Sequence, residues 1–286
     1  MNMALLNPHQ RLAAFGLSGV AALVGTSALG QALEKVGVPV DGGIDFQPAA
    51  STTAVAAVWL DYMILIIITV ITVFVTALLL YVMWRFSAKR NPVPAKFTHN
   101  APLEVAWTLI PIAILVFIGF FSLPALFFQQ EIPVADVTIK VTGNQWYWTY
   151  EYPDAENPES PVSFDSLKLE KDQLVAAGYA ESDYLLAVDN PMIVPVNKTV
   201  VVTVTGSDVS HAWAVPAFAV MHTATPGRLG QLWFKAEREG IFFGQCTTLC
   251  GQGHAYMPIE VRVVSQAVYE AWLAQAKTGN VTLASN

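Results

Sequence analysis

Two long uncharged runs constrain the fold of this 286-residue chain more than any other feature. Residues 62–84 and 105–130 contain no Asp, Glu, Lys or Arg and are rich in Ile, Leu, Val and Phe. At about 1.5 Å per residue, each run is long enough to cross the roughly 30 Å hydrocarbon core of a bilayer as a helix. Only 13% of the residues are charged, against about 25% in soluble domains. The sequence therefore predicts two transmembrane helices, over about residues 59–85 and 103–129.

A third apolar stretch, residues 12–30, follows Arg11 near the start of the chain. It is rich in Ala and Gly, and its end, Ala28-Leu29-Gly30, resembles a small-residue cleavage site. We expect residues 1–30 to form a signal peptide and Gln31 to be the mature N-terminus. A third spanning helix is the alternative interpretation of the same stretch.

The basic residues predict how the two helices are oriented. The loop between them holds four cations, Arg85, Lys89, Arg90 and Lys96. The outer flanks, residues 45–58 and 129–139, hold neither Lys nor Arg. Because basic loops stay on the cytoplasmic side, everything after Gln130 should be exported. We expect a multi-pass protein of a bacterial inner membrane whose C-terminal part lies in the periplasm.

Residues 131–264 have the pattern of an all-β domain. Val137–Thr142 and Val200–Thr205 alternate with period two, and Gly, Pro, Asn and Asp recur between such segments. Many short strands with regular turns indicate a sandwich or barrel. Residues 169–184 are more helical and charged, which suggests a surface insertion, and residues 265–286 should form a final amphipathic helix and a tail.

The exported part is acidic. From residue 129 onward it has 17 Asp and Glu against 9 Lys and Arg. This balance argues against nucleic-acid binding. It fits either an ordinary solvated surface or a surface that steers a basic partner.

Both cysteines of the chain lie in one short motif, Cys246-x3-Cys250-x3-His254-x2-Met257, with His211 upstream. Thiolate, imidazole and thioether groups are ligands that favour copper over magnesium or calcium. Two thiolates can bridge two copper ions, each with one His, and Met257 can serve as a weak further ligand. A disulfide or a zinc site is the alternative, but neither needs the Met. The motif therefore predicts a binuclear copper site for electron transfer.

Several longer runs resemble subunit II of the haem–copper cytochrome c oxidases, especially the alphaproteobacterial ones. They are Phe97-Thr-His-Asn-Ala-Pro-Leu-Glu104-Val-Ala-Trp107, Gly143-Asn-Gln-Trp146-Tyr-Trp148-Thr-Tyr-Glu151-Tyr-Pro153, Asp208-Val-Ser-His211-Ala-Trp213, Pro226-Gly-Arg228-Leu229 and Gly244-Gln-Cys246. The resemblance implies a transmembrane helix hairpin followed by a cupredoxin-like Greek-key sandwich or barrel. It also implies a CuA centre of two copper ions, held by His211, Cys246, Cys250, His254, Met257 and the backbone carbonyl of Thr248.

The same resemblance assigns roles outside the copper site. Trp146 matches the position where electrons from cytochrome c enter, although a core or interface tryptophan is the simpler interpretation of that residue alone. Glu104 matches a carboxylate at the entrance of a proton path shared with subunit I; by itself it is a helix-start residue. Glu151, Asp189 and Asp208 match acidic positions near the docking face for cytochrome c.

Three positions depart from the family pattern. Thr248 stands where the family usually has a Glu whose side chain reaches a magnesium or manganese ion at the border with subunit I. Met221 and Thr223 stand where a Lys and an Asp are usual. The five side-chain copper ligands remain, so we expect copper to bind and the border ion to be absent.

The expected function is that of the electron-accepting subunit of a respiratory cytochrome c oxidase. It would pass electrons from cytochrome c to haem in subunit I, where oxygen is reduced to water and protons are pumped. A quinol oxidase subunit is the first alternative, but that class lacks the copper ligands. A free-standing, membrane-anchored cupredoxin that carries electrons or handles copper is the second.

Overall fold

The structure, a computed structural model, describes residues 33–153 and 159–283. All of its helices and strands lie in one compact unit, Glu34–Thr282. The predicted signal peptide, residues 1–30, lies outside the described residues.

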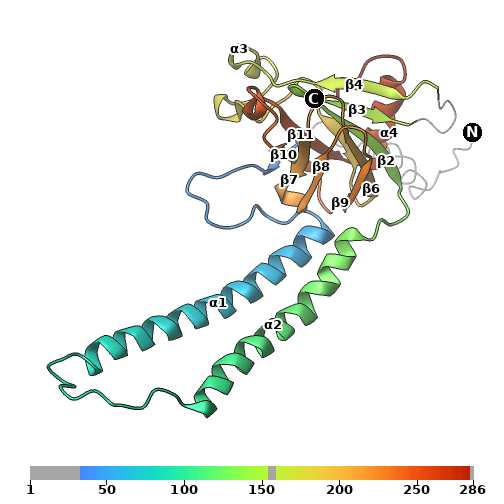
Figure 1. Ribbon diagram of the computed structural model, residues 1–286. Coiled ribbons are helices and arrows are strands. Elements are labelled where there is room, and N and C mark those ends of the chain that lie inside the picture. The colour runs from blue at the N-terminus through green and yellow to red at the C-terminus, as the bar shows by residue number, and fades with distance from the viewer. Residues whose placement is uncertain (1–32, 154–158, 284–286) are drawn as a thin grey trace, which may run out of the picture. The chain divides into compact units, whose positions relative to one another are not determined.

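Two long helices follow a short N-terminal segment, α1 (Thr52–Arg85) and α2 (Ala101–Gln130) (Figure 1). Both are long and apolar enough to cross a membrane, and the predicted transmembrane hairpin is confirmed. Asn100 caps α2 by accepting a hydrogen bond from the backbone N–H of Leu103. Pro111 and Pro124 lie inside α2, where other transmembrane helices can satisfy the freed backbone groups.

Helix α1 begins at Thr52, earlier than the predicted residue 59, because its first turn is held by the β domain. The Ser51 and Thr53 hydroxyls lie 2.9 and 2.8 Å from the carbonyl oxygen of Phe218 and donate hydrogen bonds to it. Ser51 also accepts a hydrogen bond from the Ala54 N–H, which makes it the N-cap. These contacts extend the helix to residues 52–58, which the hydropathy pattern does not assign to it.

The β domain consists of two sheets (Figure 1). The first has the order β5 (Met192–Pro195), β11 (Pro258–Val264), β10 (Gly240–Cys246), β7 (His211–Val215) and β8 (Val220–Ala224), and β1 (Lys35–Gly37) pairs in parallel with β10. The second has the order β4 (Val162–Ser166), β3 (Tyr147–Tyr152), β2 (Val137–Asn144), β6 (Thr199–Gly206) and β9 (Gly230–Lys235). This is the predicted cupredoxin-like sandwich.

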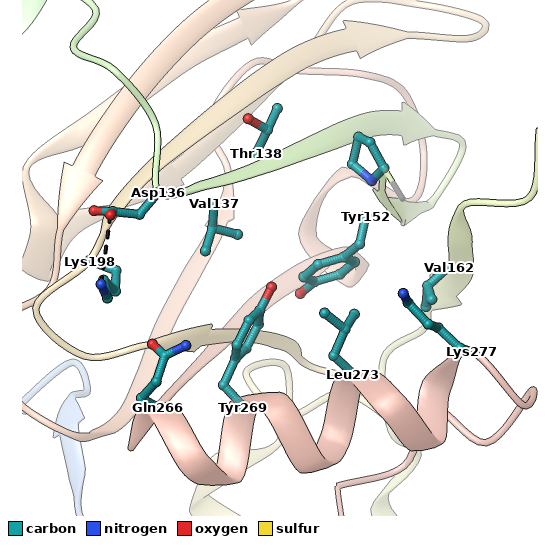
Figure 2. A pocket seen from close by; sticks show the side chains of 11 residues that line it. Asp136, Val137, Thr138, Tyr152, Val162, Lys198, Gln266, Tyr269, Leu273 and Lys277 are labelled. Atoms are coloured by element: carbon teal, nitrogen blue, oxygen red, sulfur yellow. Dashed lines mark ion pairs between the residues drawn. The ribbon is translucent and has the colours of Figure 1, made fainter. Parts of the chain in front are cut away.

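The alternating strands bury large side chains between the sheets. Trp148, Trp213, Phe234 and Phe242 are fully buried, and each such side chain contributes about 1.5–3 kcal/mol of hydrophobic free energy. The last helix, α4 (Gln266–Ala276), packs one face against the second sheet (Figure 2). Its Trp272 lies edge-on against Tyr152 of β3, with ring centroids 5.0 Å apart.

Residues 169–184 are less helical and more deeply anchored than the sequence predicts. They contain only α3 (Lys171–Leu174) and the 3-10 turn η1 (Glu181–Asp183). The hydroxyl of Tyr179 donates to the fully buried carboxylate of Glu260 on β11, and Arg262 donates to both. Lys35 on β1 pairs with the buried Asp183. Charge pairing therefore ties the insertion and the N-terminal strand to the sheet that carries the cysteines.

Candidate metal centre

The Cys–His–Met motif forms the loop between β10 and β11. Cys246 is the last residue of β10, and β11 begins directly after Met257. His254 opens the 3-10 turn η3 (His254–Tyr256) within the loop. His211 opens β7, which pairs with the end of β10 so that Trp213 lies opposite Cys246. Two neighbouring strands and one loop therefore bring all five side chains together.

The donor atoms of these residues converge. The Sγ atoms of Cys246 and Cys250 are 3.9 Å apart, and Sγ of Cys250 lies 3.5 Å from Sδ of Met257 and 3.6 Å from Nδ1 of His254. The ligand atoms of His211, Cys246 and Cys250 all lie within 4.8 Å of one another. The carbonyl oxygen of Thr248 is 3.2 Å from Sγ of Cys246. The ends of β7 and β10 and the loop thus bring two thiol groups, two imidazoles, a thioether and one carbonyl close together.

The protonation pattern of His211 fits a metal ligand. Its Nδ1 atom is buried and has no hydrogen-bond partner in the structure. Its Nε2 atom lies 2.9 Å from Oδ1 of Asp208. Although burial opposes it, the hydrogen bond with His211 lowers the pKa of Asp208, helped by the N–H groups of Val209 and Gln145. The carboxylate is therefore an acceptor, Nε2 carries the proton, and Nδ1 presents its lone pair to the centre.

The two cysteines are free thiols and both are buried. Burial, and next the neighbouring Cys246, raise the pKa of Cys250 to about 12. Two thiolates cannot stay side by side in such a place without a cation to compensate them. Thiolate and imidazole donors bind copper or zinc, and the thioether of Met257 favours copper, so the arrangement fits a copper site.

Trp146 lies directly on the ligand loop. Its Nε1–H donates to the carbonyl of Cys250 at 3.3 Å, and the side chain of Gln145 donates to the same carbonyl at 3.0 Å. A Cβ atom on Gly253 would lie only 2.3 Å from Cδ2 of Trp146. The indole ring therefore needs glycine at this point of the loop. No sequence motif predicts the roles of Gln145 and Gly253, although the Gly-x-Gly before His254 is a signal for close backbone approach.

The three acidic residues expected at the docking face all have partners within the domain. Glu151 forms an ion pair with Lys140 on the adjacent strand, at 2.8 Å. Asp189 accepts hydrogen bonds from the N–H groups of Leu167 and Asn190. Burial raises the pKa of Asp189 despite these bonds. Asp208 is bonded to His211, a candidate metal ligand, and the spacing Asp-x2-His in the sequence is consistent with this contact.

Glu104 lies in the first turn of α2. Its Oε1 atom accepts a hydrogen bond from the N–H of Asn100 at 3.0 Å. Together with the bond from Leu103 to Asn100, this satisfies two backbone donors at the start of the helix. Glu104 is therefore a helix-capping residue in this chain, whatever further role it has.

Of the three departures from the family pattern, Met221 and Thr223 lie on β8 of the first sheet, and Thr248 lies in the loop between the two cysteines. Met221 and Thr223 are exposed on β8, where Thr223 lies opposite Ala212. Thr247, next to Thr248, donates its N–H to the carbonyl of the same Ala212. Within residues 33–153 and 159–283, the cluster of His211, Cys246 and Cys250 is the only group of three or more His, Cys, Asp or Glu side chains placed to hold a metal ion.

The fold and the site together define a membrane-anchored, copper-binding electron-transfer subunit. Comparison with known proteins gives the family: the model for the cytochrome c oxidase subunit II transmembrane domain matches residues 39–125, and the model for its periplasmic domain matches residues 137–264. The chain belongs to the cytochrome c oxidase subunit II family. It is accordingly a component of the oxidase complex, and neither alternative function is favoured.

Two sequence relatives support this membership, and one solved structure is also similar to part of the chain. Cytochrome c oxidase subunit 2 of Cereibacter sphaeroides is 57% identical over 286 residues, covering 95% of this chain and 93% of the relative. A probable cytochrome c oxidase subunit 2 of Rickettsia felis is 42% identical over 236 residues, covering 82% and 72%. The crystal structure of the periplasmic domain of subunit II of the Bradyrhizobium japonicum oxidase is 49% identical and covers 52% of this chain and 99% of that one, with a TM-score of 0.46.

Proposed function

We propose that the convergent donors hold a binuclear CuA centre. This centre would receive electrons from cytochrome c and deliver them to haem in subunit I. The observation that carries the proposal is the meeting of two buried thiols with two imidazole Nδ1 atoms and one thioether. A single copper ion needs only one of the thiolates, whereas two thiolates can bridge a pair.

When bound, copper would supply reversible one-electron chemistry. The chain's own contribution is to keep the donors in place. Cys246 and the loop up to Met257 are held at both ends by paired strands, and His211 is fixed by Asp208. A ligand set on such a rigid scaffold changes little between redox states, which favours rapid electron transfer.

The number of copper ions can be tested on the purified oxidase. After subtraction of the copper bound by subunit I, metal analysis should give two coppers for each chain. Cys246→Ser should abolish the mixed-valence electron paramagnetic signal, because a hydroxyl is a poor bridge between copper ions. One copper per chain, or a Cys246–Cys250 disulfide in the loaded protein, would contradict the proposal.

Trp146 is proposed as the residue through which electrons from cytochrome c reach the centre. Its ring lies against Gly253, beside His254, and its N–H is bonded to the backbone of Cys250, so it connects the domain surface to the ligand loop. Glu151, Asp189 and Asp208 are proposed to attract the basic donor electrostatically. Glu104 is proposed to lie at the entrance of a proton path shared with subunit I.

We further propose that the chain lies in a bacterial inner membrane, with the copper domain in the periplasm and subunit I beside the helices. At the border with subunit I, a tightly held magnesium or manganese ion should be absent. Such ions prefer carboxylate oxygens, and Thr248 offers a neutral hydroxyl. Met221 and Thr223, both uncharged, lie on β8, which pairs with β7.

Growth in manganese tests this last point. The complex should show no bound manganese by electron paramagnetic resonance, whereas Thr248→Glu should restore part of the signal. A stoichiometric manganese signal in the unmodified complex would refute the absence of the ion.

A further inference from the structure

One tryptophan of the second sheet reaches across the sandwich to two of the candidate copper ligands. Trp148 lies on β3 and is fully buried. Its Nε1–H donates a hydrogen bond to the carbonyl oxygen of Met257 at 3.2 Å. Its ring also lies edge-on to the imidazole of His211, with ring centroids 6.0 Å apart. His211 opens β7 and Met257 ends the ligand loop, so a single side chain connects two ligands from separate elements.

The residue paired with Trp148 makes room for the same imidazole. Gly143 on β2 lies opposite Trp148 in the antiparallel pair of β2 and β3. A Cβ atom on Gly143 would lie 2.9 Å from Cγ and Cδ2 of His211 and 3.0 Å from its Cβ. Carbon atoms pack best at about 3.5–4.0 Å. A larger residue at position 143 would therefore push the imidazole away from the second sheet.

The bond from Trp148 fixes the chain at the point where the thioether leaves it. The Met257 side chain is buried, and its Sδ lies 3.5 Å from Sγ of Cys250. The pairing of β11 with β10 begins one residue later, at Pro258. A thioether is a weak ligand of copper and takes a long bond, so its distance from the thiols depends on where the backbone of Met257 is held. The indole N–H holds that backbone from the opposite sheet.

We propose that Trp148 and Gly143 are positioning residues of the copper centre. The indole N–H sets the place of the Met257 thioether, and the gap at Gly143 sets the place of the His211 imidazole. The proposal rests on the proposed function, because it concerns the centre that these ligands would hold. The axial ligand tunes the reduction potential of copper sites that transfer electrons. The second sheet thus helps to set that potential, although the proposed ligands all come from the first sheet and its loop.

Redox titration of the purified oxidase, followed by the mixed-valence electron paramagnetic signal, tests the role of Trp148. Trp148→Phe keeps a buried aromatic ring and loses the N–H. The midpoint potential should shift in the same direction as in Met257→Leu. The shift should be at least a threefold change in the reduction equilibrium, or roughly 30 mV at about 59 mV per tenfold change. In the Met257→Leu background, Trp148→Phe should cause no further shift, because the thioether through which it acts is gone.

Trp272→Phe is the matched control for Trp148→Phe. It also removes an indole N–H from a buried tryptophan, one that donates to the carbonyl oxygen of Val281 at 2.8 Å. Val281 is not among the ligands, so the potential should stay unchanged in Trp272→Phe. A purely structural role for Trp148 predicts instead that both variants melt at a lower temperature and that neither changes the potential.

Gly143→Ala tests the other half of the proposal, and it does so even where Trp148→Phe does not assemble. The added Cβ should displace the imidazole of His211. Electron–nuclear double resonance should detect this as a changed nitrogen coupling of one histidine. Gly119→Ala, at a position with open space around it, should leave the couplings unchanged.

Copper analysis distinguishes a failure of this inference from a failure of the proposed function. Fewer than two coppers per chain in the unmodified oxidase would overturn the CuA centre, and the inference with it. With two coppers present, an unchanged potential in Trp148→Phe would overturn the role of Trp148. A shift that persists in full in the Met257→Leu background would overturn it as well. Unchanged nitrogen couplings in Gly143→Ala would overturn the role of Gly143.

Discussion

Oδ1 of Asp208 lies 2.9 Å from Nε2 of His211, across the ring from the buried Nδ1 atom that has no partner. A carboxylate in this position fixes both the tautomer and the angle of a metal-binding imidazole. Asp208 thus acts within the domain on a ligand, besides any role in attracting a donor protein.

Replacing Asp208 with Ala should weaken copper binding by about 10–100-fold, because His211 loses the group that orients it. Competitive titration of the isolated oxidase with a copper chelator measures this affinity. Asp165→Ala removes a different exposed carboxylate, one bonded to the hydroxyl of Thr149, and should leave the affinity unchanged. Equal copper affinity in both variants would show that Asp208 does not orient His211 and acts only in attracting the donor protein.

Gly253→Ala should displace Trp146 while leaving the ligand set intact. The backbone of Gly253, with φ −93°, is accessible to alanine. The added Cβ, however, would lie 2.3 Å from the indole ring. Stopped-flow reduction by cytochrome c should slow as strongly as in Trp146→Ala, with the copper spectrum preserved.

Trp146→Phe separates the ring from its hydrogen bond, because it keeps an aromatic group and loses the N–H that contacts Cys250. We expect its electron-transfer rate to lie between those of the unmodified protein and Trp146→Ala.

The control for the Gly253→Ala experiment is Gly119→Ala, a glycine replacement at a position with open space around it. An unchanged rate in Gly253→Ala would show that the ring's position does not limit electron transfer.

Glu260 should make the stability of the domain depend on pH. Burial raises its pKa, and the nearby Arg262 opposes this only in part. Glu260 therefore keeps its proton to a higher pH in the folded state than in the unfolded state, where the pKa of glutamate is about 4.3. Folding then binds protons, and stability falls as pH rises from that value through the folded pKa.

Glu260→Gln should remove this dependence, since the amide does not titrate. Melting temperatures of the full-length chain in detergent, measured from pH 4 to 7, should rise relative to the unmodified protein as pH increases. Glu270→Gln, on the exposed side of α4, should follow the unmodified curve. Parallel curves for Glu260→Gln and the unmodified protein would contradict the prediction.

Ser51→Ala should destabilise the junction between the first helix and the β domain. It removes the N-cap of α1 and one of two hydroxyl bonds to the Phe218 carbonyl. The expected loss is about 0.5–2 kcal/mol, read as a lower midpoint of thermal unfolding of the β domain. Thr69→Ala, which removes a hydroxyl bonded within α1, should change this midpoint much less.

Local patterns in the chain are enough to predict the large elements. The uncharged runs predict both helices because a membrane span depends on length and apolar character alone. The predicted final helix is present as α4, and the Ser265 hydroxyl caps it by accepting a hydrogen bond from the N–H of Val268. The candidate copper ligands Cys246, Cys250, His254 and Met257 lie within twelve residues of one another, so their proximity follows from the sequence itself.

Contacts between distant segments are decided only by the tertiary structure. The start of α1 at Thr52 depends on the carbonyl of Phe218, which is 167 residues from Ser51. The fit of Trp146 on Gly253 and the burial of Glu260 against Tyr179 also join separate elements. A sequence pattern reports which residue types repeat nearby, whereas such contacts depend on how two sheets and a helix pack. For this chain, the sequence determined the class of fold and the set of candidate ligands, and packing decided how the His211 and Trp146 side chains are oriented.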